Sequence, residues 1–487
     1  MNTIQQVKQS WFSNVRGDVL AGIVVALALI PEAIAFSIIA GVDPMVGLYA
    51  AFSIALVIAF VGGRPGMISG ATGAMALLMI TLVADHGLEY LLAATILTGI
   101  IQLLFGVFKL SSIMKFVPRS VMIGFVNALA ILIFTSQLQH FVGETWIMYS
   151  LVALTLAIIY ILPRFTTAVP STLVAIIVVT GLAIIMNFGV RTVGDMGTLS
   201  STLPIFALPD IPLTFETFMI ILPYSLALAV VGLLETLLTA SIVDDMTDTD
   251  SNKNKESRGQ GIANVVSGCF GGMAGCAMIG QSVINVKSGG RGRLSSLTAA
   301  VTLMFLIIVL GPVVIQIPMA ALAGVMIMVS IGTFDWNSLM NLHKLPRTDA
   351  IVMVTVVATV VYTHDLSIGV FAGVLMSAMF FAWKVSKVHV QKIYSDKNRS
   401  VTYHVEGQLF FASVTDFLEK VDFTEDVDVV TFDVSQSHLW DDSAVGAFDK
   451  IESKFEQRDI QVHYTGMDRE SSMLYDRING LSKASGH

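Results

Sequence analysis

The sequence is poor in the residues that soluble or disulfide-stabilised proteins need. Of its 487 residues only 13% are charged and two are cysteine, while 54% are hydrophobic, and the mean hydropathy is +0.76. Soluble domains carry roughly one-quarter charged residues, so a wholly soluble protein is excluded. Cys269 and Cys276 lie in one Gly-rich apolar stretch, which gives neither a disulfide framework nor a zinc ligand set. We interpret both as small packing residues.

Other absences narrow the function further. The net charge of −8 leaves no basis for a nucleic-acid partner. The polar N-terminus lacks a cleavable signal pattern, so the first apolar run is expected to stay as a helix. Up to about Trp383 the charges only punctuate apolar runs, and from Lys384 onward they are spread through ordinary soluble sequence. We therefore expect a lipid-embedded part followed by a soluble domain.

The apolar runs predict about fourteen membrane segments, because a spanning helix needs roughly 20 residues and a helix broken inside the membrane needs fewer. Their expected ranges are 19–39, 45–61, 73–83, 90–108, 120–138, 147–162, 171–186, 218–243, 261–272, 277–286, 296–317, 320–332, 350–362 and 368–383.

Lys and Arg are biased toward cytoplasmic loops in membrane proteins, and this rule orients the segments. With the N-terminus inside, the inner loops hold Arg64, Lys109, Lys115, Arg119, Arg164, Lys253, Lys255, Arg258, Lys287, Arg291, Arg293, Lys344 and Arg347. The outer loops hold only Arg191 among basic residues, together with Asp43, Asp85, Glu89, Glu144, Asp195, Asp210, Glu216 and Asp365. We expect a multi-pass protein of the inner (plasma) membrane with both termini in the cytoplasm.

Two segments are too short and too rich in small residues to cross as unbroken helices. They begin with ISGATGAMALL (68–78) and GGMAGCAMIGQSVINV (271–286), the third and tenth of two sets of seven. Sets of odd number insert with opposite orientation, which predicts an inverted repeat with substrate held where half-helices meet. A half-helix N-terminus offers unpaired N–H groups and a partial positive charge to an anion. The alternative is that these glycines only permit tight helix packing.

Two acids lie at matching positions, Glu32 in the first segment and Glu235 in the eighth. A carboxyl group inside the membrane is costly and is a functional candidate by default. Burial favours its neutral form, as a proton-coupling site requires, and Thr239 follows Glu235 by one helical turn. Purely structural hydrogen bonding between helices is the alternative. We interpret the acids at 244, 245, 248 and 250 as a solvated loop and expect no metal site.

The C-terminal part alternates strand-like and helical patterns: VTYHVEGQLFF, TDFLEKV, VDVVTFDVS, SAVGAFDKIESKFEQ and IQVHYTG. This order predicts a small βαβ-type domain. Ser443 follows two acids at an expected helix start. A capping role explains Asp442 and Ser443, and phosphorylation of Ser443 is the alternative. No catalytic constellation is present, so we expect a regulatory domain, with a cytoplasmic protein as its partner, rather than an enzyme.

Taken together, several motifs resemble those of the sulfate permease (SulP, solute carrier 26-like) family of anion transporters with a C-terminal STAS domain. They are GDVLAGIVVALALIPEAIAF (17–36), SGATGAM (69–75), ETLLTA (235–240), GQGIANVVSGCFGG (259–272) and NVKSGGRGRLS (285–295). The resemblance covers nearly the whole chain.

The resemblance implies an α-helical polytopic membrane protein, with about fourteen segments in two inverted repeats of seven, core and gate domains, and a small cytoplasmic α/β STAS domain. A homodimer is expected. The implied limits are 1–17 for the N-terminus, 18–385 for the transport domain (repeats 18–187 and 216–385) and 400–480 for STAS.

The resemblance also implies the site residues. The anion would lie near Glu32, Phe36, Thr72, Gly73, Ala74, Met75, Ala277, Met278, Ile279, Gly280 and Gln281, and Glu235 and Thr239 would hold the coupled ion, a proton or alternatively sodium. Many relatives have Arg where this chain has Gln281, and some favour a hydroxyl near Ile279.

The expected function is secondary active transport of sulfate, bicarbonate or a dicarboxylate by alternating access, without an organic cofactor. Three alternatives stay open. The first is a sodium-coupled bicarbonate symporter, and the second is an uncoupled anion channel or exchanger, or a voltage-sensing membrane protein, on the same fold. The third is a membrane signalling protein whose STAS domain is the output.

Overall fold

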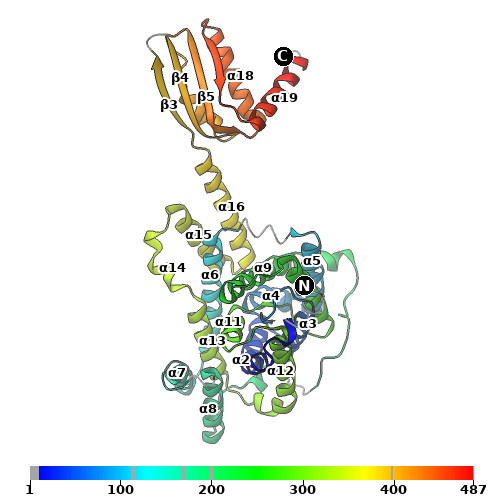
Figure 1. Cartoon of the computed structure of the whole chain (residues 1–487). Coiled ribbons are helices and arrows are strands. Elements are labelled where there is room, and N and C mark those ends of the chain that lie inside the picture. Colours follow the sequence, from blue (N-terminus) through cyan, green and yellow to red (C-terminus); the bar gives the residue numbers. More distant parts are fainter. Residues whose placement is uncertain (1–9, 111–116, 167–169, 198–201, 396–398, 486–487) are drawn as a thin grey trace. The chain divides into compact units, whose positions relative to one another are not determined.

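The computed structural model describes residues 10–110, 117–166, 170–197, 202–395 and 399–485. The chain divides into two compact units, residues 1–374 and 375–487, and the division falls inside helix α16. Figure 1 shows the helices of the first unit and the sheet with its helices in the second.

Every expected membrane segment corresponds to a helix in the structure. In chain order these helices are α2 (Val15–Ala40), α3 (Pro44–Val61), α4 (Gly73–His86), α5 (Leu88–Val107), α6 (Arg119–Leu138), α7 (Trp146–Ile161), α8 (Ser171–Met186), α9 (Phe215–Thr247), α10 (Lys253–Cys269), α11 (Ile279–Lys287), α12 (Arg293–Val314), α13 (Met319–Thr333), α15 (Arg347–Thr363) and α16 (Leu366–Val385). A short helix, α14 (Trp336–Met340), precedes α15. In the described part of this unit there are also four short 3-10 turns, η2 (Gln139–Phe141), η3 (Leu162–Arg164), η4 (Val193–Asp195) and η5 (Leu342–Lys344).

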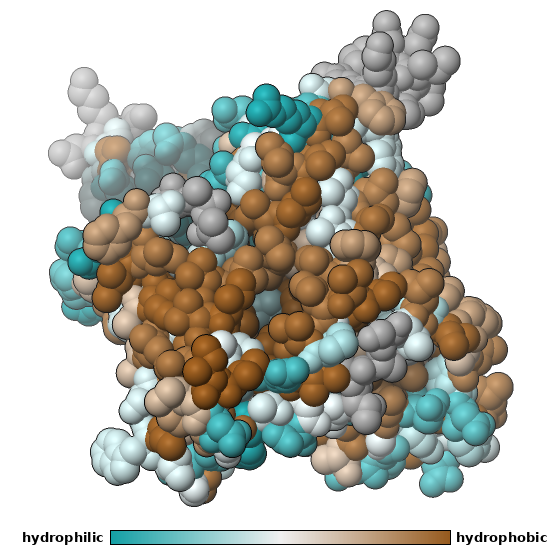
Figure 2. All heavy atoms as spheres, turned by 90° about the horizontal axis from the view of Figure 1, so that it is seen from below, coloured by the Kyte–Doolittle hydropathy of each residue, from teal (hydrophilic) through white to brown (hydrophobic). Residues whose placement is uncertain are grey.

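The outer surface of these helices is suited to lipid. Within the described residues, eight helices are long and apolar enough to cross a membrane. Large apolar side chains such as Ile185, Phe305 and Phe371 are exposed, which costs free energy in water but not in a bilayer. Figure 2 shows a face on which hydrophobic residues cover broad continuous areas. The chain is a polytopic α-helical membrane protein.

Helix contacts repeat between the two halves of the first unit. Helix α2 packs against α12 and α4, and its counterpart α9 packs against α5 and α11. In the same way α6 packs against α15, and α13 packs against α7. Each of these contacts thus has an equivalent between the matching helices, as an internal repeat requires.

Two short strands join the halves directly. Strand β1 (Ser69–Gly70) precedes α4, strand β2 (Cys276–Ala277) lies just before α11, and the two pair in antiparallel fashion, Ser69 with Ala277 and Gly70 with Cys276. A Cβ atom on Gly275 would lie 2.1 Å from the Gly70 carbonyl oxygen, so this crossing requires glycine. The antiparallel pairing places α4 and α11 in opposed directions after the crossing.

Two buried carboxylates hold the main chain of loops in the first unit. Buried Asp18 accepts hydrogen bonds from the N–H groups of Arg291 and Gly292, at 2.7 and 3.0 Å, just before α12 begins. Buried Glu256 accepts from the N–H groups of Gly63 and Arg64. These carboxylates satisfy main-chain donors that would otherwise be left unpaired.

The second unit is a four-stranded sheet with helices. Its elements are β3 (His389–Ser395), β4 (Ser400–Leu409), α17 (Val414–Glu419), β5 (Val429–Leu439), α18 (Asp442–Glu456), β6 (Gln461–Thr465) and α19 (Arg469–Ser485). The strand order is β3-β4-β5-β6, with β3 antiparallel to β4 and the other pairs parallel. Strand β3 precedes the expected domain start at residue 400.

Alternation along the strands builds the core of this unit. Val401, Tyr403 and Val405 of β4 are buried on one face of the strand and pack with Phe432 of β5 and Phe448 of α18. A period of two residues places every second side chain on the same face of a strand. Parallel strands with crossover helices explain why helical and strand patterns alternate in this part of the sequence.

Candidate anion-binding site

Helix α4 begins at the strand crossing with uncapped backbone donors. Thr72 is its extended N-cap residue, and its side chain makes no capping hydrogen bond among the described residues. The first intrahelical bond joins the N–H of Ala76 to the carbonyl oxygen of Thr72. The N–H groups of Gly73, Ala74 and Met75 therefore have no intrahelical partner, and they concentrate the positive end of the helix dipole there.

Helix α11 begins in a related way from the other half. The N–H of Ala277 already donates to Thr236 Oγ1 at 3.2 Å, and the N–H of Met278 donates to the carbonyl oxygen of Ile68 at 2.9 Å. Ala277 and Met278 therefore have their backbone donors satisfied within the protein. The donors without an intrahelical partner are those of Ile279, Gly280 and Gln281.

A cavity of about 440 Å³ lies beside these two helix starts. Helices α2, α9 and the segments at α4 and α11 form one wall, and α6 and α13 form the other. Its lining consists of Glu32, Phe36, Thr72, Gly73, Phe125, Val126, Leu129, Ile133, Glu235, Met278, Ile279, Gly280, Gln281, Val283, Ile284, Met328, Val329, Gly332 and Thr333. Among the described residues, this lining includes two acids and no Lys, Arg or His.

Glu235 is held by side chains from both halves. Glu235 is 7% exposed as a residue, and its Oε2 accepts a hydrogen bond from Cys276 Sγ at 2.9 Å. The same sulfur lies 3.1 Å from Thr72 Oγ1. Partly buried Glu32 lines the same cavity as Gln281 of α11. Glu235 thus contacts the strand that leads into α11, and Glu32 lies on α2, which packs against α11.

The expected anion-binding residues divide into two groups. Eight of the eleven line the cavity: Glu32, Phe36, Thr72, Gly73, Met278, Ile279, Gly280 and Gln281. Ala74, Met75 and Ala277 are fully buried and do not line it. Ala74 and Met75 can reach a ligand only through their main-chain N–H groups.

Of the expected ion-coupling pair, only Glu235 lines the cavity. Thr239 is fully buried, and its hydroxyl donates to the main-chain carbonyl of Glu235. In the second unit, Ser443 is half-buried near the start of α18. The cap of that helix is the side chain of Asp441, which accepts from the N–H of Ala444 at 3.1 Å. The expectation that Asp442 and Ser443 supply this cap is therefore wrong, because Asp441 has the extended N-cap conformation.

Sequence reasoning missed two features of the site. Cys276 was interpreted as a packing residue, yet its thiol connects Thr72 with Glu235. The wall formed by α6 and α13, with Phe125, Leu129 and Met328 among its members, was not expected. These side chains are apolar like those that face lipid, so the sequence contains no signal that separates them.

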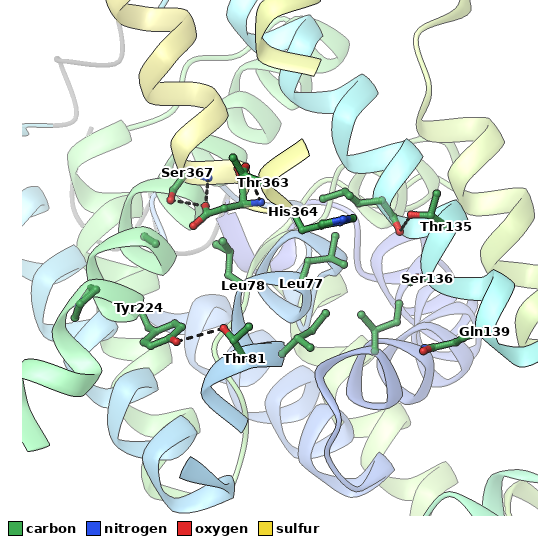
Figure 3. Close-up of a pocket in the computed structure, with 16 residues that line it drawn as sticks. Leu77, Leu78, Thr81, Thr135, Ser136, Gln139, Tyr224, Thr363, His364 and Ser367 are labelled. Carbon is green, nitrogen blue, oxygen red and sulfur yellow. Dashed lines mark hydrogen bonds between the residues drawn. The ribbon is translucent and has the colours of Figure 1, made fainter. Parts of the chain in front are cut away.

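A second cavity, of about 950 Å³, lies one helical turn farther along α4 and α6. Leu77 and Thr81 of α4, Leu132 of α6 and Tyr224 of α9 line it. The turn between α15 and α16 contributes His364, as Figure 3 shows. Gly73 and Ile133 line the first cavity, whereas Leu77 and Leu132 line the second. The two linings thus lie one turn apart along α4 and on neighbouring residues of α6.

Comparison with known proteins identifies the family of this chain. The model of the sulfate permease family matches residues 15–148 and 145–356, and the STAS domain model matches residues 390–479. The chain belongs to the sulfate permease family. This confirms the resemblance seen in the sequence, and it makes the chain a membrane anion transporter with a C-terminal STAS domain and not an enzyme.

Relatives within the sulfate permease family extend over the full chain. "Putative sulfate transporter YbaR" of Bacillus subtilis is 63% identical, over 98% of this chain and 100% of its own. "Bicarbonate transporter BicA" of a Picosynechococcus strain is 26% identical, over 93% of this chain and 89% of its own.

Solved structures agree on the fold of this sulfate permease. The transmembrane domain of a cyanobacterial bicarbonate transporter, BicA, matches with a TM-score of 0.67 at 29% identity, over 74% of this chain and 98% of that one. Murine Solute Carrier 26 family member A9 matches with a TM-score of 0.81 at 17% identity, over 95% and 87%. The polytopic transporter fold followed by an α/β STAS domain is thus confirmed.

Proposed function

We propose that this protein is a proton-coupled secondary transporter of small oxyanions that works by alternating access, with sulfate as the first candidate substrate. The name of the relative with 63% identity supports sulfate. Bicarbonate is the competing substrate, because BicA matches nearly the whole chain in sequence. A dicarboxylate is the third candidate.

The lining of the cavity between the two helix starts carries the proposal. Two helix N-termini direct unpaired N–H groups toward a space that contains no basic side chain among its lining residues. Such donors bind an anion although the site has no fixed positive charge. Binding of this kind suits a transporter, because the anion must also be released. Phe125 and Ile133 on α6 and Met328 on α13 form the wall that would move relative to the helix starts.

The two acids in the same cavity support proton coupling. An ionised carboxylate about 4 Å from an anion repels it by roughly 4 kcal/mol at the effective dielectric constant of a partly solvated site. Glu32 and Glu235 would therefore oppose anion binding unless at least one were protonated. Uptake of a proton at Glu235 removes this repulsion, so proton and anion binding favour each other.

The contacts of Glu235 favour a proton over sodium. Hard cations such as sodium prefer several oxygen ligands, as the related preference of calcium and magnesium for oxygen illustrates. Here the Cys276 thiol, which is not an oxygen ligand, contacts one carboxylate oxygen of Glu235. Thr239 is fully buried and is absent from the cavity lining, so its hydroxyl oxygen does not face a cation in the cavity.

Several finer features remain part of the proposal. We place both termini in the cytoplasm of a plasma-membrane protein and expect a homodimer with a cytoplasmic partner for the STAS domain. We keep the proposed domain limits. The N-terminal segment is 1–17, the transport domain is 18–385 with repeats at 18–187 and 216–385, and the STAS domain is 400–480. Regulation through Ser443 belongs to the same proposal.

Uptake of labelled sulfate into proteoliposomes tests the function. An inward proton gradient at zero membrane potential should drive accumulation in the absence of sodium. Glu235→Gln should retain exchange of sulfate between equal concentrations and lose accumulation driven by the gradient, whereas the matched variant Glu32→Gln reports whether any cavity acid suffices. A sodium requirement would contradict proton coupling, and flux that ignores both gradients would favour a channel.

A further inference from the structure

Cys276 lies between Thr72 of the proposed anion site and Glu235, the proposed proton-binding residue. Its thiol is fully buried. The sulfur is 2.9 Å from Glu235 Oε2 and 3.1 Å from Thr72 Oγ1. Thr72 and Glu235 are themselves 3% and 7% exposed, and both line the anion cavity. One thiol therefore joins the residue in front of α4 to the acid on α9.

The direction of these hydrogen bonds depends on the protonation of Glu235. A thiol has one proton and a weak acceptor sulfur, and a hydroxyl has one proton and two acceptor lone pairs. When Glu235 is ionised it only accepts, so Cys276 donates to it and the Thr72 hydroxyl donates to the sulfur. The hydroxyl proton of Thr72 is then directed away from the cavity.

Protonation of Glu235 reverses the direction of both hydrogen bonds. The carboxylic O–H of Glu235 donates to the sulfur of Cys276, and the thiol S–H donates to the Thr72 oxygen. The Thr72 proton is released from the sulfur and can rotate into the cavity, where it donates to an anion beside the N–H groups of α4. Only hydroxyl and thiol rotations are involved, because the added proton stays on Glu235.

We propose that Cys276 is a positioning residue that links the two sites: protonation of Glu235 turns the Thr72 hydroxyl toward the bound anion through the thiol. This inference rests on the proposed proton-coupled function. It adds a direct hydrogen bond to the loss of charge repulsion, so that proton binding strengthens anion binding in two ways.

Binding of labelled sulfate to the purified full-length protein, measured against pH, tests the link. In the parent, sulfate binds more tightly at low pH. Without the sulfur, Thr72 can donate to the anion at every pH. Cys276→Ala should therefore reduce this low-pH gain roughly tenfold, the value of one hydrogen bond to a charged group, by tightening sulfate binding at high pH. Cys276→Ser keeps one donor and acceptor in place and should restore the gain. Cys269→Ala, at the cysteine remote from the acid, is the matched control and should resemble the parent.

Thr72→Val provides an independent measurement if Cys276→Ala fails to fold. It should weaken sulfate binding more at low pH than at high pH, where the hydroxyl proton is held by the sulfur. Added to Thr72→Val, Cys276→Ala should not change the remaining pH dependence further. Equal losses at both pH values in Thr72→Val, a further change of pH dependence in the double variant, or a parental pH profile in Cys276→Ala would overturn the link.

Glu235→Gln separates the two proposals. Its amide donates as the protonated acid does, so its sulfate affinity should be independent of pH and close to the low-pH value of the parent. pH dependence that survives this substitution removes Glu235 as the coupling residue, and the proposed function fails. Loss of pH dependence in Glu235→Gln together with an unchanged Cys276→Ala profile removes only the thiol link.

Discussion

The side-chain hydroxyl of Thr239 donates a hydrogen bond to the main-chain carbonyl of Glu235, 2.7 Å away and one turn earlier in α9. This back-bond is a common arrangement for threonine inside a helix. It turns the hydroxyl along its own helix and away from the anion cavity, although the spacing of the two residues in the sequence suggested a shared ion site.

This geometry predicts that Thr239 is dispensable for coupling. Thr239→Val keeps the side-chain shape and removes the hydroxyl, and we expect gradient-driven sulfate uptake within about twofold of the parent, a free-energy change well below that of a typical buried hydrogen bond. Thr239→Ser serves as the control for packing. A large loss in the valine variant, recovered in the serine variant and sensitive to sodium, would restore the sodium assignment.

Gly280 offers a direct test of where the anion lies. A Cβ atom added to Gly280 would meet no atom within 4 Å, whereas one on Gly73 would lie 2.9 Å from Ile133 Cδ1 and 3.0 Å from Phe36 Cε1. Substitutions at Gly280 should therefore leave packing intact. Gly280→Asp places a negative charge beside the helix start and should weaken sulfate binding by roughly a hundredfold.

The neutral control for this substitution is Gly280→Asn, which has nearly the same size and should bind sulfate far better than the aspartate variant. Thermal unfolding should be similar for both proteins. Similar sulfate affinities of the two variants would place the anion away from α11. At Gly73, even alanine should impair transport, because it presses against side chains on both walls of the cavity.

Gln281 is an uncharged residue of the cavity lining. It is 3% exposed and lies beside Glu32 in the cavity lining. Gln281→Arg should tighten sulfate binding by roughly tenfold and bicarbonate binding less, because attraction scales with the charge of the anion. Binding of both anions is compared by competition with labelled sulfate.

Glu32 modulates this effect, since an arginine at position 281 would also pair with its carboxylate. The double variant Gln281→Arg with Glu32→Gln should therefore show a larger preference for sulfate than Gln281→Arg alone. Gln281→Met controls for the loss of the amide. Equal gains for divalent and monovalent anions would indicate that residue 281 lies outside the field of the bound anion.

The helices could be predicted from the sequence because each must present a long apolar surface to lipid or to its neighbours. Hydropathy does not locate the ends of a helix whose residues are polar but buried. Helix α10 begins at Lys253, eight residues before the apolar run at 261, and there Glu256 is buried because it accepts from the N–H groups of Gly63 and Arg64. Such partners come from distant sequence, so no local pattern shows them.

The candidate site could be predicted only in outline. Gly-rich starts of two half-helices locate the region, but which side chains face the cavity depends on helix rotation and on the crossing of β1 with β2. Met75 is therefore buried against other helices, while Met278 lines the cavity. Cys276 looked inert because a thiol in an apolar run is usually a packing residue.

The second unit contains a carboxylate whose loss should be measurable in stability. Glu425 is 9% exposed, and its Oε1 accepts from Lys392 Nζ and Tyr394 OH, each at 3.0 Å, and from Tyr403 OH at 3.2 Å. Glu425→Ala leaves these donors without their acceptor. We expect a loss of about 2 kcal/mol, reduced by the exposure of Lys392, and a smaller loss in Glu425→Gln.

Amide hydrogen exchange in β4 of the full-length protein measures this change, with α4 amides as an internal control. The same region has a defined pH response. Burial, followed by the charge of Glu425, raises the pKa of Tyr403 to about 12 from its ordinary value of 10.0. The folded state therefore holds the phenolic proton more tightly, and this stabilisation is complete below about pH 10 and lost as pH rises toward 12. Unchanged β4 protection in Glu425→Ala would contradict the role of Glu425.

The two cavities predict the orientation of the protein in the membrane. The larger cavity includes Gln139 at the end of α6, and the smaller one includes exposed Ile284, three residues before Lys287 on α11. Basic residues mark cytoplasmic ends, so the Ile284 end is expected to face the cytoplasm. Gln139→Cys and Ile284→Cys are compared in a Cys269→Ser background, where the remaining native thiol, Cys276, is fully buried. A membrane-impermeant thiol reagent added to intact cells should label the first variant and spare the second, and inside-out vesicles should reverse this result. The opposite pattern would invert the topology, and labelling of both variants from one side would show that the two cavities open to the same compartment.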